Sequence, residues 1–310
     1  MINAAIVGLG WWGKTLVESG ENSEVLRIVA AATRTVSGEV EAFVKAKGLR
    51  LAASYEALLA DPAIEAVILT TPHSLHAAQV IAAAAAGKHV FCEKPFTLTK
   101  HEAEEAVAAV RKAGVTLGLG YNRRFHPEMA RLRERVRSGE LGTILHVEAT
   151  MTFPNALLLK PSHWRAQHDE TPCGGLTPMR VHAVDGMIDL CGEIDHVFCQ
   201  SFRRVVEIDS DDTTSILFRM KNGMSGYLGT MTATGPGFSF QVFGSKASPT
   251  SPAPPRRNGA CACSAPAGSS RSRARSRSGR RPPSMSRARR SKPSRGRQRA
   301  GRPTRSRLTR

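Results

Sequence analysis

The chain has 310 residues and a formal net charge of +18, which allows about two domains and excludes a disulfide-stapled mini-protein. The positive charge is concentrated at one end. Residues 247–310 hold 19 of the 44 lysines and arginines and no acidic residue, whereas residues 1–246 hold 25 basic and 26 acidic residues. We therefore interpret the first 246 residues as a nearly neutral globular chain, and the basicity as a property of the C-terminal segment.

The cysteine pattern and the apolar runs bear on the cellular compartment. The six cysteines show neither the spacing of a zinc site nor that of a disulfide framework, which favours a reducing environment. The N-terminus lacks the basic region of a signal peptide. The longest apolar run, residues 80–86, is too short to cross a membrane. We expect a cytoplasmic protein with no metal ion and no membrane contact.

Strand and helix signals alternate through the first 122 residues. A capping box at Thr99 and Glu102 and a stop at Gly114 delimit the last of the helices. The predicted strands are 2–7, 25–32, 64–70, 88–92 and 115–120, and the clearest helices are 38–47, 54–60, 74–86 and 100–113. Short strands with little polar alternation, separated by helices, indicate a parallel sheet covered on both faces. We predict a doubly wound α/β (Rossmann) domain over residues 1–122.

The pattern changes after Asn122, where strands become longer and are linked by turns. The dipeptide Asn222-Gly223 is a strong hairpin signal. Helices are predicted at 126–138 and 179–191, and strands at 143–153, 194–206, 212–220, 224–233 and 237–244. This pattern predicts an α+β domain with a mostly antiparallel open sheet over residues 123–246, which the change at residue 247 leaves incomplete.

Residues 247–310 form a basic Ser/Pro/Arg-rich segment without Val, Ile, Phe, Tyr or Trp. A segment of this composition cannot bury enough apolar surface to fold, so we predict a disordered tail. The abrupt change after Lys246 indicates a shift of reading frame. The alternative is a genuine tail that binds polyanions through charge alone. Specific nucleic-acid binding is not expected, because no aromatic residue in the tail could stack on bases.

A glycine-rich turn lies directly after the first predicted strand and opens a helix. In Gly8-Leu9-Gly10-Trp11-Trp12-Gly13, the first glycine permits the tight turn, and Gly10 lets the backbone approach a pyrophosphate. Gly13 allows helix and strand to pack closely. The motif predicts dinucleotide binding, with Trp11 and Trp12 beside the phosphates. The alternative is a glycine turn without a ligand.

The end of the second predicted strand carries Thr33 and Arg34, where an acidic residue would bind the ribose 2′-hydroxyl of NAD. A hydroxyl and a guanidinium suit a 2′-phosphate, since arginine binds phosphate with charge-assisted bonds. We therefore expect NADP to be preferred over NAD. The alternative is a solvated Arg34 that stacks on adenine and tolerates both cofactors.

Two more segments follow strands at the carboxyl edge of the sheet, where open α/β folds bind ligands. The first contains Thr71, Pro72 and His76 as candidate cofactor contacts. Its alternatives are Ser74 as a helix N-cap and His76 as a structural histidine. The second contains Glu93 and Lys94, and its alternative is a surface lysine with no role.

These segments and four later ones occur together in the order typical of one family. The matching pieces are Gly8–Gly13, Thr71-Pro72 with His76, Glu93-Lys94-Pro95, Gly120-Tyr121-Asn122-Arg123-Arg124-Phe125, Trp164-Arg165, and Gly174-Gly175 with His182 and Asp185. Over residues 1–246 the chain thus resembles the glucose–fructose oxidoreductase/inositol dehydrogenase (Gfo/Idh/MocA) family. The resemblance implies an NAD(P)-dependent oxidoreductase that transfers a hydride to or from a sugar, a polyol or a related cyclic small molecule.

The resemblance also implies roles for individual residues. Lys94 would orient cofactor and substrate, Glu93 would contact the ribose next to the nicotinamide, and Pro95 would follow a cis peptide bond. Trp164 and Arg165 would reach toward the cofactor. His182 would be the catalytic histidine beside Lys94. Asn122 joins the expected cofactor contacts, and Arg123 and Asp185 join Lys94 and His182 as expected substrate contacts.

The predicted helix around His182 agrees with this implication. His182, Asp185 and Asp189 form one polar stripe on an otherwise apolar helix, and the alternative is a solvated face. A histidine can accept the hydroxyl proton near neutral pH, and Lys94 can stabilise the developing alkoxide.

Two features depart from the family pattern. Pro178 stands where many members carry an aspartate, which indicates a different proton relay or a different substrate. The missing late strands leave open a catalytically impaired dinucleotide-binding protein, and they make the homo-oligomer typical of the family doubtful for this chain.

Overall fold

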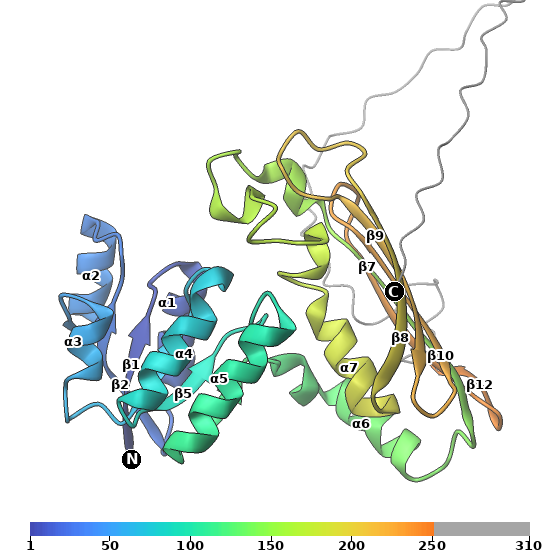
Figure 1. The fold of residues 1–310 in the computed structure, drawn as a ribbon, viewed down its shortest axis with the longest axis horizontal. Helices are drawn as coiled ribbons and strands as arrows, with labels where there is room; N and C mark the ends of the chain where they lie inside the picture. Colours follow the sequence, from blue (N-terminus) through green and yellow to red (C-terminus); the bar gives the residue numbers. More distant parts are fainter. Residues whose placement is uncertain (251–310) are drawn as a thin grey trace, which may run out of the picture. The chain divides into compact units, whose positions relative to one another are not determined.

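The computed structural model describes residues 1–250, which form two six-stranded β-sheets with helices packed against them (Figure 1). The predicted tail beyond residue 250 lies outside the described residues. None of the helices that the structure describes is long and apolar enough to cross a membrane.

The first sheet is entirely parallel, with the strand order β3-β2-β1-β4-β5-β6. Its strands are β1 (Ile2–Val7), β2 (Leu26–Ala32), β3 (Arg50–Leu51), β4 (Ala66–Leu69), β5 (His89–Cys92) and β6 (Leu117–Leu119). The chain reverses its direction of winding between β1 and β4, and ligands of such folds bind outside the carboxyl ends of the strands at that point. The prediction of a doubly wound parallel sheet is confirmed.

Helices cover both faces of this sheet. Val17 of α1 (Trp11–Gly20) and Val40 and Val44 of α2 (Gly38–Ala46) pack on one face. The other face is covered by α3 (Tyr55–Leu59), α4 (His76–Ala85) and α5 (Lys100–Ala113). The start and the end of α5 have local causes: Thr99 and Glu102 form the predicted capping box, and Gly114 ends the helix in a left-handed conformation.

The second sheet has the strand order β12-β11-β7-β10-β9-β8. Its strands are β7 (Ile144–Thr152), β8 (Ile194–Phe202), β9 (Thr213–Met220), β10 (Ser225–Met231), β11 (Gly237–Gly244) and β12 (Ala247–Thr250). All neighbouring strands are antiparallel except β7 and β10. The mostly antiparallel sheet and the hairpin at Asn222-Gly223 are confirmed: Gly223 has a positive φ of 85°, and the Asn222 side chain accepts the Met224 amide.

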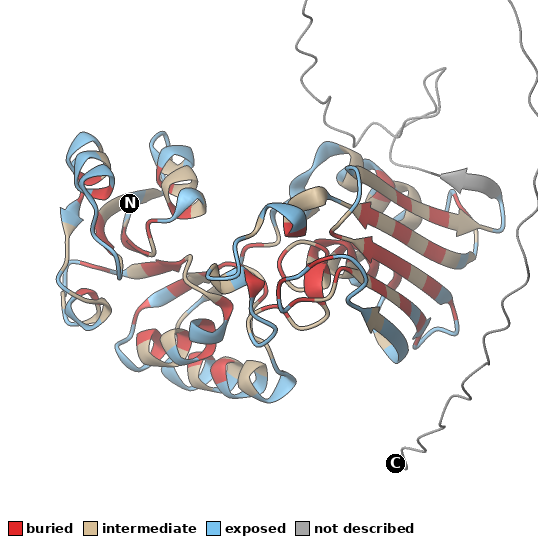
Figure 2. Cartoon of the chain, turned by 90° about the horizontal axis from the view of Figure 1, so that it is seen from above, coloured by how far each residue is buried: buried red, intermediate tan, exposed pale blue. Residues whose placement is uncertain are grey.

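One face of the second sheet is covered by α6 (Pro127–Arg137) and α7 (Val181–Cys191), which pack on a core that includes Val147, Ile216 and Leu228. Buried and more exposed residues alternate along β7 and β9, as expected for a sheet covered on one side (Figure 2). The apolar stripe of α7 therefore lies in the core.

The structure differs from the predicted elements at their edges. The strand predicted over 194–206 ends at Phe202, and the short β3 was not predicted. Ala247–Thr250, at the start of the predicted tail, pair with β11, so the second sheet extends four residues beyond the expected boundary. Several 3₁₀ turns were not predicted either, among them His73–Leu75, Pro154–Leu158 and Trp164–Ala166.

Candidate active site

The three glycines of the first motif are required, or tolerated, for different structural reasons. Gly8 follows β1 with a φ of +96°, and a Cβ there would lie 2.9 Å from the Thr70 carbonyl oxygen. A Cβ on Gly13 would lie 2.1 Å from the Gly8 carbonyl oxygen, so close packing excludes any side chain. A Cβ on Gly10 would meet no atom within 4 Å. Only Gly10 therefore faces open space that a ligand can fill.

That open space lies at the amino end of α1. The N-cap residue Gly10 provides no side-chain hydrogen bond to the first turn of the helix, and no acidic residue lies in that turn. Backbone N–H groups and the helix dipole there favour an anion. Trp11 is 78% exposed beside this turn, and Thr33 and Arg34 follow β2 at the same edge of the sheet. These residues fit the pyrophosphate and ribose of a dinucleotide.

The segment after β4 forms a short 3₁₀ turn, His73–Leu75, before α4 begins at His76. Thr71 donates to the Gln79 side chain at 2.5 Å. Ser74 is not an N-cap, contrary to that alternative. Its amide and hydroxyl donate instead to the Glu170 carboxylate, which comes from the second part of the chain. Ser74 therefore contacts a residue of the second domain and does not cap the helix that follows it.

The His76 side chain is fully buried, and each ring nitrogen faces a backbone carbonyl. Nδ1 lies 2.8 Å from the Pro95 oxygen, and Nε2 lies 3.1 Å from the Thr71 oxygen. Burial lowers the pKa of His76, although both acceptors favour the protonated ring. The imidazole thus joins two loops of the site. This geometry agrees with the structural alternative, and direct contact with a cofactor stays a prediction.

Lys94 lies in a partly buried position after β5, and the Lys94–Pro95 peptide bond is cis, as the resemblance implies. Its Nζ donates to the Pro178 carbonyl oxygen at 2.7 Å. Burial lowers the pKa of Lys94, Arg165 and Arg123 lower it further, and Glu93 opposes them. Glu93 is buried beside it, and its carboxylate accepts the Lys94 amide. The position of Pro178 therefore contributes a backbone acceptor in place of a carboxylate.

His182 lies in the first turn of α7 and is 8% exposed. Its Nδ1 is buried without a hydrogen-bond partner among the described residues, and its ring meets the edge of Tyr121 at a centroid distance of 6.0 Å. Burial lowers the pKa of His182 to about 3, with Lys94 and Arg123 acting in the same direction. The imidazole is therefore neutral at physiological pH and close enough to Lys94 to interact with it.

The two aspartates of α7 are held by arginines. Arg124 donates to both oxygens of Asp185, at 2.7 and 2.6 Å, and Arg133 donates to Asp189 at 2.7 Å. This bidentate geometry fixes the segment after β6 against α7. The polar stripe thus divides into His182, which faces the site, and two aspartates that hold the helix in place. Contact between Asp185 and a substrate stays a prediction.

Trp164 and Arg165 lie in a 3₁₀ turn next to the His73 side chain. The Trp164 ring meets His73 edge-on at 4.8 Å, and the Arg165 guanidinium lies 4.2 Å from the Trp164 ring centroid. His73 in turn bonds the Glu170 carbonyl oxygen through Nδ1 at 2.7 Å. The structure therefore brings this pair to the segment after β4, and their contact with a cofactor stays a prediction.

Sequence reasoning missed three residues of the site region. Tyr121 contacts His182, and Glu170 binds the turn after β4. Arg180 is fully buried, and its guanidinium donates to the carbonyls of Met151, Gly175 and Met231. Burial lowers the pKa of Arg180 to about 10. Only Tyr121 had a sequence signal, because it lies within a matched motif.

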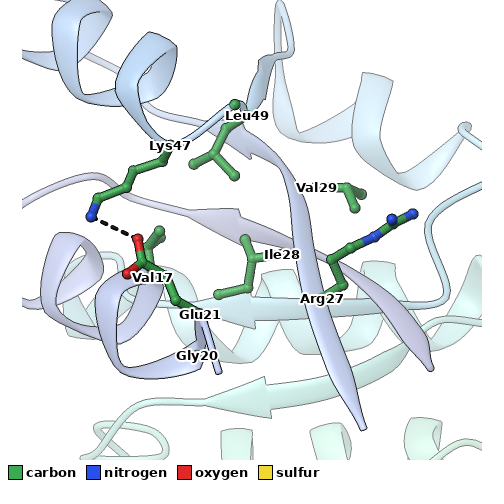
Figure 3. Close-up of a pocket in the computed structure, with 9 residues that line it drawn as sticks. Val17, Gly20, Glu21, Arg27, Ile28, Val29, Lys47 and Leu49 are labelled. Carbon is green, nitrogen blue, oxygen red and sulfur yellow. Dashed lines mark ion pairs between the residues drawn. The ribbon is translucent and has the colours of Figure 1, made fainter. Parts of the chain in front are cut away.

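A separate cavity of about 310 Å³ lies at the opposite edge of the first sheet (Figure 3). It is lined by the ends of α1 and α2 and by the first half of β2, and a Glu21–Lys47 ion pair of 2.7 Å crosses its rim. This is the amino edge of the strands, away from the glycine loop, so the cavity does not belong to the candidate active site.

The glycine loop at the switch point and the neighbouring lysine and histidine define a class: a two-domain oxidoreductase that binds a nicotinamide dinucleotide. The family follows from the matches. Residues 2–121 match the model described as an oxidoreductase family with an NAD-binding Rossmann fold, and residues 129–249 match the GFO/IDH/MocA C-terminal domain. The chain belongs to the Gfo/Idh/MocA oxidoreductase family.

Individual relatives agree with this assignment. The uncharacterized oxidoreductase YrbE of Bacillus subtilis is 30% identical over 255 residues, which cover 80% of this chain and 72% of the relative. The 1,5-anhydro-D-fructose reductase of Ensifer adhaerens is 34% identical over 51% of this chain and 50% of its own length. A crystal structure of a candidate NADPH-dependent oxidoreductase from Desulfitobacterium hafniense has a TM-score of 0.74 at 30% identity, covering 79% of this chain and 70% of that one.

Proposed function

We propose that the protein oxidises or reduces a hydroxyl or carbonyl carbon of a sugar, a polyol or a related cyclic small molecule, using NADP in preference to NAD. The observation that carries the proposal is the proximity of Lys94 and His182. Lys94 follows β5 of the first sheet and His182 lies in α7 beside the second sheet, and the Lys94 Nζ donates at 2.7 Å to the carbonyl of Pro178, which precedes His182 by four residues. The name of the Ensifer relative, a reductase of an anhydrosugar, supports the substrate class.

The chemistry divides between these two residues. A bound nicotinamide supplies the hydride acceptor or donor. In the oxidative direction, the neutral His182 imidazole takes the proton of the substrate hydroxyl while the C–H bond breaks. Lys94 donates to the same oxygen and stabilises its developing negative charge. Burial and the charges of Lys94 and Arg123 lower the pKa of His182, and a developing negative charge on the substrate oxygen would act in the opposite direction and favour proton uptake by the imidazole.

The preference for NADP rests on Arg34. It is exposed directly after β2, where a 2′-phosphate would lie, and the structure records no ion pair for it among the described residues. The description of the Desulfitobacterium relative names NADPH, whereas those of other similar structures name NAD or NADH, so the proposed preference rests on Arg34 alone. We expect Arg34→Ala to weaken NADPH binding at least tenfold and to leave NADH binding within about twofold.

A fluorescence titration of Trp11 and Trp12 with NADPH and NADH tests cofactor binding first. Turnover is then measured over a panel of sugars and polyols. We expect His182→Asn to lower kcat about 10²- to 10⁴-fold with an unchanged cofactor Kd. Binding of neither cofactor would refute the proposal. Binding without turnover on any panel compound would identify a dinucleotide-binding protein that lacks activity.

A further inference from the structure

An excess of unpaired positive charge surrounds Lys94 and His182. Arg123 is exposed in the 3₁₀ turn Asn122–Phe125, between Tyr121, whose ring contacts His182, and Arg124, which binds Asp185 of the same helix. The charges of Arg123 and of the exposed Arg165 both act on Lys94. The structure records no side-chain hydrogen bond and no ion pair for either guanidinium among the described residues. By contrast, the neighbouring Arg124 is paired with Asp185 on both oxygens. The site therefore holds two arginines that no carboxylate of the described chain neutralises.

The acidic groups of the region are already in use. Asp185 and Asp189 bind Arg124 and Arg133, and Glu93 is buried against the Lys94 backbone. The residue that accepts from Lys94 on the opposite wall is Pro178, which offers only a carbonyl. A wall with these groups lacks the free carboxylates that commonly accept hydrogen bonds from the hydroxyls of a neutral sugar.

The two arginines differ in what they face. Arg165 stacks on Trp164 beside the segment after β4, the side of the site that we assign to the cofactor. Arg123 lies 5.7 Å from the centroid of Phe238 in β11, on the side of the second sheet. The aromatic ring attracts the guanidinium without using its N–H donors, which match a planar or tetrahedral oxyanion.

We propose that the substrate carries an anionic oxygen group, a carboxylate or a phosphate, close to the carbon that reacts, and that Arg123 binds this group. The inference rests on the proposed function and narrows its substrate class from sugars and polyols to their acids or phosphate esters. Because Arg123 is exposed, it stays hydrated when a neutral analogue binds, and that analogue lacks only the charge-assisted bond that the anion forms.

The test uses the full chain saturated with NADP⁺, in about 0.15 M salt, with three probes that share one ring: D-glucuronate, D-glucose 6-phosphate and D-glucose. Two readouts are taken for each probe: the rate of NADPH formation and the shift in Tm of the cofactor-loaded protein. We expect at least one anion to exceed glucose about tenfold in kcat/KM and to raise Tm more. Comparison of the two anions distinguishes a carboxylate site from a phosphate site.

Variants assign the effect to Arg123. We expect Arg123→Gln to remove the preference for the anion while changing the NADPH Kd less than twofold, and Arg123→Lys to restore part of the preference. Arg137→Gln removes the same charge from the exposed end of α6 and serves as the matched control. The preference should survive in that variant, even though the basic C-terminal segment also attracts anions.

Two results would overturn the inference. The first is that neither anion raises the Tm of the loaded protein more than glucose does. The second is that Arg123→Gln weakens all three probes equally. Failure of the proposed function is a separate outcome, because it appears as a lack of nicotinamide binding in the titration that precedes these assays.

Discussion

His73 and His182 are two buried histidines whose pKa is strongly lowered by folding. Burial lowers the pKa of both to about 3, and neighbouring cations act in the same direction. A histidine in the unfolded chain has its ordinary pKa of about 6.5, so between these two values the unfolded state binds more protons. Each buried, neutral histidine therefore decreases the free energy of unfolding progressively as the pH falls from about 6.5 toward 3.

We predict that the free energy of unfolding decreases by about 2 kcal/mol for each of these histidines between pH 7.5 and pH 5. Urea denaturation at the two pH values measures the decrease. The His182→Asn variant should lose less stability across this interval than the wild-type chain. His101→Asn, on the exposed face of α5, is the matched control and should behave like wild type. An equal pH dependence in all three proteins would contradict the prediction.

Asp212 stabilises the loop between β8 and β9 by accepting hydrogen bonds from its backbone. Its Oδ2 accepts the backbone N–H groups of Arg204, Val205 and Val206, at 2.9, 2.6 and 3.1 Å, and Thr213 donates to Oδ1. Burial acts to raise the pKa of Asp212, but these donors outweigh it and hold the pKa below its usual value. The carboxylate therefore fixes the connection between β8 and β9.

We predict that Asp212→Ala destabilises the chain by about 3 kcal/mol, because it leaves several backbone donors without their acceptor. Chemical denaturation monitored by circular dichroism measures the loss. Asp209→Ala, in the same loop but with its side chain exposed, should cost less than about 1 kcal/mol. Similar losses in the two variants would show that the N–H donors find other partners.

At the scale of elements, two glycines at the start of α1 have different roles, since Gly13 is required for packing and Gly10 faces the proposed ligand. A Cβ at Gly13 would overlap the Gly8 carbonyl, whereas a Cβ at Gly10 would enter open space at the helix terminus. We predict that Gly13→Ala destabilises the first domain by more than about 2 kcal/mol. Gly10→Ala should remain within about 1 kcal/mol of wild type and bind NADPH at least tenfold more weakly.

Thermal unfolding and the fluorescence titration together check this pair of glycine variants. Since Gly10 has an ordinary φ of −70°, its replacement causes no backbone strain. Wild-type affinity in a folded Gly10→Ala variant would mean that the pyrophosphate does not approach this position. Wild-type stability of Gly13→Ala would mean that α1 can shift away from β1.

At the scale of the whole molecule, charge is divided between the folded part and the C-terminal segment. Residues 1–246 are nearly neutral, and all 19 basic residues of the segment 247–310 lie beyond Thr250. We predict that the full chain binds heparin with a steep dependence on salt, and that a chain ending at Thr250 does not. NADPH affinity should be the same in both chains. Heparin binding by the shortened chain would place the polyanion site on the folded part.

Much of this fold was predictable because its signals are local. Alternating apolar and helical stretches, the Thr99–Glu102 capping box and the Asn222-Gly223 turn depend on neighbouring residues, and each is present as predicted. The pairing of β7 with β10 was not predicted, since a parallel pair joins strands far apart in the chain. The observed strand ends also differ from the predicted ones by a few residues, because tertiary packing and not intrinsic propensity determines where a strand ends.

The sequence by itself determined the fold class, the dinucleotide loop, and the identity of Lys94 and His182 as candidate catalytic residues. These depend on short motifs whose chemistry is fixed by residue type. Only the tertiary structure decided how the motifs meet: the Pro178 carbonyl accepts from Lys94, Glu170 binds Ser74, and Arg124 holds Asp185. Partners separated by 84, 96 and 61 positions are brought together by the packing of two sheets, which no local pattern encodes.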